Sequence, residues 1–198
     1  MKLEVRPAEK RDLPRIKSLI DEYIAVDFYS MEDLEGMIRG EDDLLFVAVD
    51  ADRGDLVVSY FYAFLSTLDD ALRILLVPDK PPALRKYAGD TRVGVFKTTS
   101  TDPDYRNRGI FSSFMVDLQP VLRDRGAKLI MNTALRPLGR QIPILNVLRR
   151  TGFVPVEELY RPWTTSGYCP YCRQAPCICD AVLYIREFDE KKDVETDG

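Results

Sequence analysis

The residues best suited to chemistry lie in the stretch DPDYRNRGIFSSFMVDL, residues 102–118. An apolar strand pattern gives way there to a helical pattern, and Arg106, Arg108 and Gly109 stand at the change. The first N–H groups of a helix have no partners within it and lie at the positive end of its dipole, so they can hold an anion. Gly109 allows close approach to the backbone, and guanidinium groups form charge-assisted bonds to phosphate oxygens. The stretch therefore predicts a site for a phosphate-bearing ligand.

Two common phosphate-binding motifs are absent from the sequence. It has no Gly-x4-Gly-Lys-Ser/Thr, which argues against a nucleoside triphosphatase loop, and no Gly-x-Gly-x-x-Gly, which argues against a dinucleotide-binding fold. A simpler interpretation of the stretch is a tight turn at Gly109 with both arginines in solvent, and the spacing alone does not exclude it.

A second reactive group is the run CPYCRQAPCIC, which holds Cys169, Cys172, Cys177 and Cys179, all 4 cysteines of the chain. Four thiolates complete a tetrahedral structural zinc site and leave no open position for water. The spacing C-x2-C-x4-C-x-C therefore predicts a zinc knuckle, with disulfides or free thiols as the alternatives. Disulfides are disfavoured in a cytoplasmic setting, and the spacing matches no common ferredoxin pattern for an iron–sulfur cluster.

The composition limits the chemistry and the partners. The chain has no histidine, so any catalysis must use carboxylates, Tyr, Cys, Lys, backbone groups or water. A net charge of −4 argues against nucleic-acid binding, which is usually accompanied by a basic excess. No apolar run reaches the ~20 residues of a membrane helix. The first residues, MKLEVRPAEKRD, lack the apolar core of a secretory signal. We expect a cytoplasmic protein outside the membrane.

The elements that must position these residues follow from apolar periodicity. Apolar, β-branched and aromatic runs predict strands at residues 3–6, 44–50, 56–65, 93–101, 127–135, 153–160 and 181–188. Helical spacing predicts helices at residues 13–24, 30–40, 110–122 and 142–153.

Prolines and glycines refine these elements. Pro120 is expected to bend or break the third helix, whereas Pro143 suits the first turn of the fourth and Gly152 its left-handed end. The proline-containing residues 70–90 predict a long connection that touches substrate.

This order of elements predicts one mixed α/β domain over residues 1–190. The cysteine-rich residues 169–179 form an insertion between the last two strands, and residues 191–198 form a charged, flexible tail.

PDYRNRGIF resembles the acyl-CoA binding motif of the GNAT superfamily of N-acyltransferases, Arg/Gln-x-x-Gly-x-Gly/Ala, with matches at Arg106 and Gly109. RRTGFVPVEELY resembles the family's run ending in Gly-Phe, matched by Arg150, Gly152 and Phe153. Phe111 departs from the small final residue of the motif, and Leu148 stands where many members carry a tyrosine that protonates the leaving thiolate.

The resemblance implies a central mixed, mostly antiparallel sheet flanked by helices, in which acyl-CoA lies in a gap beside the strand that precedes the motif. Backbone groups of Thr99 and Thr101 would pair with the pantetheine arm, and the N–H groups from Asn107 to Ser112 would hold the pyrophosphate. The implied acyl-CoA site consists of Thr99, Thr101, Arg106, Asn107, Arg108, Gly109, Ile110, Phe111 and Ser112. No carboxylate lies in VGVFKTTST to act as a base, and spacing does not choose among Tyr60, Tyr62, Tyr160 and water, so no catalytic residue is named.

The implied activity is transfer of an acetyl group from acetyl-CoA to a primary amine by direct attack in a ternary complex. The acceptor is a small molecule, a lysine or a protein terminus. Two alternatives remain open: a non-catalytic acyl-CoA sensor, and an interaction protein whose zinc knuckle binds a partner. A homodimer is compatible with the sequence.

Overall fold

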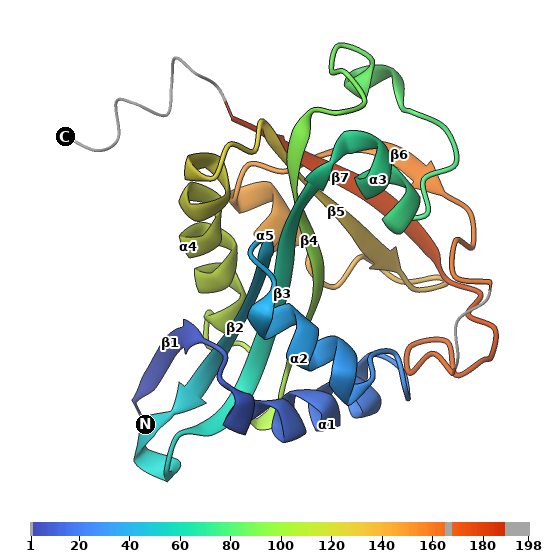
Figure 1. Cartoon of the computed structure of the whole chain (residues 1–198). Helices are drawn as coiled ribbons and strands as arrows, with labels where there is room; N and C mark the ends of the chain where they lie inside the picture. Colours follow the sequence, from blue (N-terminus) through green and yellow to red (C-terminus); the bar gives the residue numbers. More distant parts are fainter. Residues whose placement is uncertain (1, 165–167, 189–198) are drawn as a thin grey trace.

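In the computed structural model, which describes residues 2–164 and 168–188, a seven-stranded sheet has the order β1-β2-β3-β4-β5-β7-β6 (Figure 1). All neighbouring strands are antiparallel except β4 and β5, which are parallel. The strands are β1 (Leu3–Pro7), β2 (Asp43–Asp50), β3 (Leu56–Thr67), β4 (Arg92–Thr101), β5 (Leu129–Arg136), β6 (Val154–Leu159) and β7 (Asp180–Glu187). The expected mixed, mostly antiparallel sheet is confirmed.

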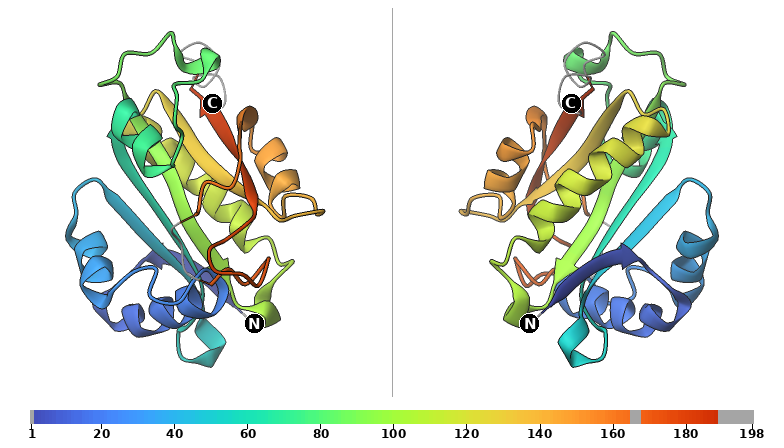
Figure 2. Two further views of the ribbon diagram at one scale, coloured as in Figure 1. Left: turned by 90° about the vertical axis from the view of Figure 1, so that its right-hand side faces the viewer. Right: turned by 90° about the vertical axis from the view of Figure 1, so that its left-hand side faces the viewer.

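Helices cover both faces of this sheet. They are α1 (Leu13–Tyr23), α2 (Met31–Arg39), α3 (Leu68–Ile74), α4 (Ile110–Asp124) and α5 (Leu145–Arg150). Figure 2 shows α1 and α2, in blue, on the opposite side of the sheet from α4 and α5. The strands alternate their side chains accordingly: Phe61 and Phe96 pack toward α4, whereas Tyr60 packs toward α1 and Val95 toward α3.

Strands β4 and β5 stay paired only at their beginnings. Their register runs from Gly94 opposite Ile130 to Phe96 opposite Asn132 and then ends. Beyond that point β4 remains paired with β3 as far as Thr101, and β5 remains paired with β7 as far as Arg136. The two halves of the sheet therefore separate, and backbone groups that would complete a ladder face the space between them.

Three sequence-based expectations need correction. Residues 68–74 form helix α3 within the supposed connection, because Thr67 caps the helix by accepting a hydrogen bond from the Asp70 N–H and the prolines come after it. Helix α4 does not break at Pro120 but continues to Asp124, since Leu118 and Leu122 on either side are buried against the sheet. Pro143 lies in a turn before α5, closed by the Leu145 N–H on the Ile142 carbonyl.

The cysteine-rich residues lie between β6 and β7, as expected, and the predicted tail at residues 191–198 lies outside the described residues. Among the helices that the structure describes, none has the length and apolar character to span a bilayer.

Candidate active site

The connection from β4 to α4 forms a compact turn with two left-handed residues. A short 3₁₀ turn at Pro103–Tyr105 is followed by Asn107 with φ 60° and Gly109 with φ 80°. Gly109 is the residue that precedes the first turn of α4, which begins at Ile110. Within the described chain, the N–H groups of residues 109–112 have no hydrogen-bond acceptor, whereas the Ser113 N–H donates to the Gly109 carbonyl. These amides converge at the start of α4, where an anion is favoured.

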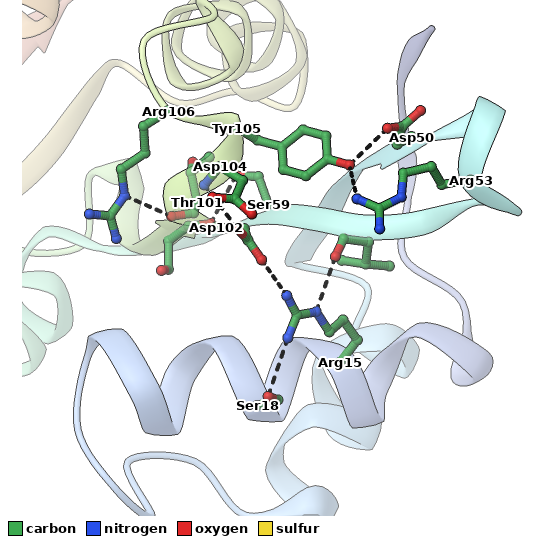
Figure 3. Close-up of polar contacts among 12 residues, drawn as sticks. Arg15, Ser18, Asp50, Arg53, Ser59, Thr101, Asp102, Asp104, Tyr105 and Arg106 are labelled. Carbon is green, nitrogen blue, oxygen red and sulfur yellow. Dashed lines mark hydrogen bonds and ion pairs between the residues drawn. The ribbon is translucent and has the colours of Figure 1, made fainter. Parts of the chain in front are cut away.

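Polar side chains fix this turn to the rest of the protein (Figure 3). Asp102 forms an ion pair with Arg15 of α1 at 2.5 Å, and its backbone N–H donates to the Val58 carbonyl of β3. The buried Tyr105 hydroxyl donates to the Asp50 carboxylate at 2.8 Å and accepts from the Arg53 guanidinium at 3.1 Å. The turn is therefore held by contacts with α1 and with the β2–β3 hairpin.

The two arginines of the motif lie against the turn. Arg106 donates from Nε to the Thr101 carbonyl at 3.0 Å, and its guanidinium lies 5.1 Å from the ring centre of Tyr23. Arg108 donates to the Asp104 carbonyl at 3.0 Å and lies over the Tyr105 ring. Both guanidiniums therefore brace the turn that precedes α4.

The open edge of β4 carries the backbone groups singled out from the sequence. Because the Asp102 N–H points to β3, the alternation of an antiparallel ladder turns the N–H groups of Thr101 and Thr99 to the other side, where β5 has moved away. The Thr99 hydroxyl donates to the Tyr60 carbonyl, and the Thr101 hydroxyl is 2.8 Å from that of Ser59. The side chains of both threonines therefore anchor β4 while their backbone lines the gap.

A cleft of about 230 Å³ occupies the space between the separated strands. Thr99 of β4 and Thr133 of β5 line its two sides, and Phe111 of α4 closes one wall by stacking on Phe61 with ring centres 6.0 Å apart. Two segments form the far wall of the cleft: the segment after α1, which includes Phe28, and the cysteine-rich loop. Further aromatic residues of this wall are Tyr23, Trp163, Tyr168 and Tyr171.

Solved structures with the same arrangement are N-acetyltransferases. Arabidopsis thaliana NAA60 with acetyl-CoA superposes with a TM-score of 0.71 at 16% identity over 94% of this chain and 99% of that chain. The same enzyme with a bisubstrate analogue gives 0.68 at 18% identity, over 94% and 98% of the two chains. The ribosomal-protein-S18-alanine N-acetyltransferase of Escherichia coli gives 0.62 at 15% identity, over 96% and 98%. The protein has the GNAT fold. No protein-family model and no curated sequence matches the chain.

Two polar residues of this GNAT cleft were not anticipated from the sequence. Phe96 pairs with Ala63 and Thr98 with Tyr62, so Lys97 stands opposite no residue of β3 and forms a β-bulge. Its half-buried side chain lines the cleft and donates from Nζ to the Ile74 carbonyl at the end of α3, at 3.0 Å. Burial lowers the pKa of Lys97. Only the register of the β3–β4 pair reveals this position.

Asn132 marks the point where the strands part. Its Nδ2 donates to the Phe96 carbonyl at 2.8 Å, which fixes the orientation of the amide, because the other orientation would oppose two oxygens. Its Oδ1 is buried and has no hydrogen-bond partner in the described part of the chain, and the residue lines the cleft. The GNAT gap therefore begins beside an acceptor oxygen that a ligand N–H can use.

The tyrosines considered as proton donors lie elsewhere. Tyr60 is 0% exposed and Tyr160 is 76% exposed, and the Tyr62 hydroxyl donates to Asp43 at 2.6 Å. None of the three lines the cleft. Leu148, at the position of the common GNAT tyrosine, is fully buried in the core between the sheet and α4.

The four cysteines come together at the far wall of the cleft. All of their Sγ atoms lie within 4.8 Å of one another, and the four thiols are free of disulfides. A tetrahedral zinc–thiolate site places its sulfurs about 3.8 Å apart, as follows from Zn–S bonds of about 2.3 Å. Cys169 and Cys177 also line the cleft, while Trp163 and Leu135 pack against the cluster. The donor set and its spacing suit a structural zinc ion.

The thiols of this cluster influence one another. Burial raises the pKa of Cys179 to about 11 and also raises that of Cys177, and the neighbouring Cys169 sulfur reinforces both shifts. Burial acts in the same direction on Cys172, but hydrogen bonds from the backbone at Ile178 and Gln174 lower its pKa to about 7. A cation bound among these sulfurs would favour their thiolate forms.

Proposed function

We propose that the protein is an acyl-CoA-dependent N-acyltransferase that moves an acetyl group from acetyl-CoA to a primary amine. One observation carries this proposal: β4, whose pairing with β5 ends at Phe96, continues into the turn before α4, where the N–H groups of residues 109–112 have no acceptor within the described chain. A nucleotide diphosphate on a long, amide-containing arm fits such a site, because the amides hold the diphosphate while the open strand edge receives the arm.

Different residues along the cleft would hold different parts of acetyl-CoA. The N–H groups of Gly109, Ile110, Phe111 and Ser112, with Asn107, Arg106 and Arg108 at their border, would hold the pyrophosphate. Thr99 and Thr101 would receive the pantetheine arm, and the Asn132 Oδ1 would accept from one of its N–H groups.

The reaction takes place where the arm ends, beside the bulge at Lys97. There a backbone N–H of β4 would polarise the thioester carbonyl and stabilise the oxyanion. The amine enters between the segment after α1 and the cysteine-rich loop and attacks the carbonyl carbon directly. A carbon–nitrogen bond forms, the carbon–sulfur bond breaks, and CoA leaves as its thiol.

We further propose that Cys169, Cys172, Cys177 and Cys179 hold a structural zinc ion. The ion would fix the loop between β6 and β7, which forms one wall of the acceptor side. Four thiolates leave no open coordination position on the zinc ion for substrate, so the ion would act by holding one wall of the cleft in place.

The acceptor class is a primary amine on a small molecule, a lysine or a polypeptide terminus, and the proposed setting is the cytoplasm, with the protein acting alone or as a homodimer. A titration with acetyl-CoA followed by an assay across an amine panel tests the function. We expect the titration to show a heat of acetyl-CoA binding, and we expect the assay to show release of CoA with at least one amine. Binding without turnover would favour a sensor, and the absence of binding would exclude the acyltransferase class.

A matched pair of glycine substitutions locates the diphosphate. Gly109 (φ 80°) and Gly54 (φ 67°) both have left-handed backbones, and a Cβ on either meets no atom within 4 Å. Gly109→Val and Gly54→Val should therefore each destabilise the fold by a comparable ~1–2 kcal/mol. Only Gly109→Val is expected to weaken acetyl-CoA binding, by about tenfold, because a side chain there obstructs the amides. Equal affinities for the two variants in calorimetry would place the diphosphate elsewhere.

A further inference from the structure

The proposed reaction needs a group that removes a proton from the acceptor. An alkyl ammonium has no lone pair for attack, so the amine must first lose a proton near the thioester. The chain has no histidine, and no Asp or Glu is among the described residues that line the cleft. The titratable lining groups are Tyr23, Lys97, Tyr168, Tyr171 and the metal-ligand candidates Cys169 and Cys177.

Most of these groups are unsuited to the task. The two cysteines belong to the sulfur cluster, and Tyr168 and Tyr171 flank Cys169 and Cys172 at the outer wall. A hydrogen bond with Glu22 raises the pKa of Tyr23 to about 12. Lys97 is the remaining candidate, and it arises from the bulge of β4, the strand whose open edge would hold the acyl donor.

We propose that Lys97 is the proton acceptor for the incoming amine, an inference that rests on the proposed acyltransferase function. Neutral Lys97 Nζ takes one proton from the substrate ammonium and becomes an ammonium itself. The freed lone pair attacks the thioester carbon; as the carbon–sulfur bond breaks, the second nitrogen-bound proton passes to the departing sulfur. Lys97 then releases its proton to solvent, so the net products are the amide, CoA thiol and one proton.

The surroundings of Lys97 favour its neutral form. No carboxylate forms an ion pair with Lys97 within the described residues, and the nearest polar partner is the uncharged Ile74 carbonyl. The charged and titratable groups on neighbouring elements are satisfied elsewhere: Tyr62 of β3 donates to Asp43, and Asp70 and Arg73 of α3 pair with each other at 2.8 Å. A buried cation without a counter-ion is costly, and this agrees with the lowered pKa of Lys97.

A purely structural role is the competing explanation, because the Nζ bond to Ile74 also caps the end of α3. Arginine separates the two roles, since a guanidinium keeps a donor for the carbonyl but does not lose its proton near neutral pH. Lys80 offers the matched control: it is also half-buried and donates to a backbone carbonyl, that of Tyr87 at 2.6 Å, but it does not line the cleft.

The decisive experiment compares wild type, Lys97→Arg and Lys80→Arg in acetyl-CoA affinity, thermal unfolding and kcat between pH 6 and 10. We expect Lys97→Arg to bind acetyl-CoA normally but to lose about 100- to 10,000-fold in kcat, with Lys80→Arg unaffected. The wild-type kcat should rise as Lys97 loses its proton, at a pH below the ordinary lysine range, and this rise should be absent in Lys97→Arg. A loss of less than about tenfold would overturn the assignment.

A second measurement does not depend on the variant folding. Competitive labelling of wild-type lysines with acetic anhydride across the same pH range, read by peptide mass spectrometry, compares the titration of Lys97 and Lys80. Lys97 should become reactive at the lower pH, and equal titration would overturn the proposal. A wild-type protein that turns over no amine overturns the acyltransferase function as well, whereas an active Lys97→Arg overturns only the role of Lys97.

Discussion

The turn before α4 leads into a helix that lines the cleft through Phe111, and the cysteine-rich loop lines the same cleft through Cys169 and Cys177, but the two regions are stabilised in different ways. The turn is tied to α1 and the β2–β3 hairpin through Asp102 and the buried Tyr105. In the described part of the cysteine-rich loop, the Cys169 N–H donates to Gln174 and the Arg173 N–H to Cys169, both within the loop itself. The turn is therefore held by contacts with other elements, whereas the described hydrogen bonds of the cysteine-rich loop are local, and under the proposed function a zinc ion would add the fixed point that this loop lacks.

Removing the metal should affect the two regions very differently. Cys177→Ser is expected to reduce bound zinc from about one ion per chain to nearly none and to lower kcat/KM for the amine by more than about tenfold. Acetyl-CoA affinity should change by less than about twofold, because the α4 amides are held by other contacts. Elemental analysis, kinetics and calorimetry on the same preparation measure these three quantities.

Zinc restored to chelated wild type provides the control for that variant. Activity should return with the metal. A parallel loss of acetyl-CoA affinity and zinc would show that the two regions are coupled, and unchanged activity in the metal-free protein would show that the wall does not need the ion.

Disrupting the turn should produce the converse pattern. Tyr105→Phe removes a donor from the buried Asp50 carboxylate, which is 2% exposed, and should lower the free energy of unfolding by about 1–3 kcal/mol. Acetyl-CoA affinity should fall severalfold while zinc content stays constant. Tyr160→Phe, at a residue 76% exposed, is the control and should leave urea denaturation unchanged. Equal stability of the two variants would remove Tyr105 from the support of the turn.

The smallest expected effect concerns the thiols of the metal-free protein. Because backbone hydrogen bonds lower the pKa of Cys172 to about 7, its thiolate fraction should rise as pH increases through 7, earlier than for an ordinary thiol near 8.5. Iodoacetamide labelling followed by peptide mapping should therefore reach half its maximal rate near pH 7 at Cys172 and at higher pH at Cys179. The same order in zinc-loaded protein would argue against metal binding by these sulfurs.

Local patterns in the sequence were sufficient to predict many of the helices, strands and turns of this structure. The helix expected at residues 30–40, the strand before Asp102 and the change from strand to helix at Gly109 each depend on a few neighbouring residues, and each lies where the pattern placed it. The cysteine spacing likewise predicted the cluster that the fold assembles.

The residues that escaped prediction depend on contacts between distant segments. Lys97 enters the cleft because β3 and β4 pair with a one-residue offset, and Asn132 matters because the β4–β5 register ends there. Nothing near either residue in the chain encodes these registers. Helix α3 was missed because the prolines that follow it obscured a short apolar pattern from Leu68 to Leu72.

The short pairing between β4 and β5 has a consequence for how the binding cleft of a protein with this fold can change through substitution. Within the described residues, three residue pairs, Gly94 with Ile130 through Phe96 with Asn132, join strands β1 to β4 to strands β5 to β7. A substitution that tilts the later half can widen or narrow the opening for the acceptor without altering the strand that would carry the donor. If the protein is the proposed acyltransferase, a change of amine acceptor would then require substitutions in one half of the sheet, while the other half keeps the strand that holds acetyl-CoA.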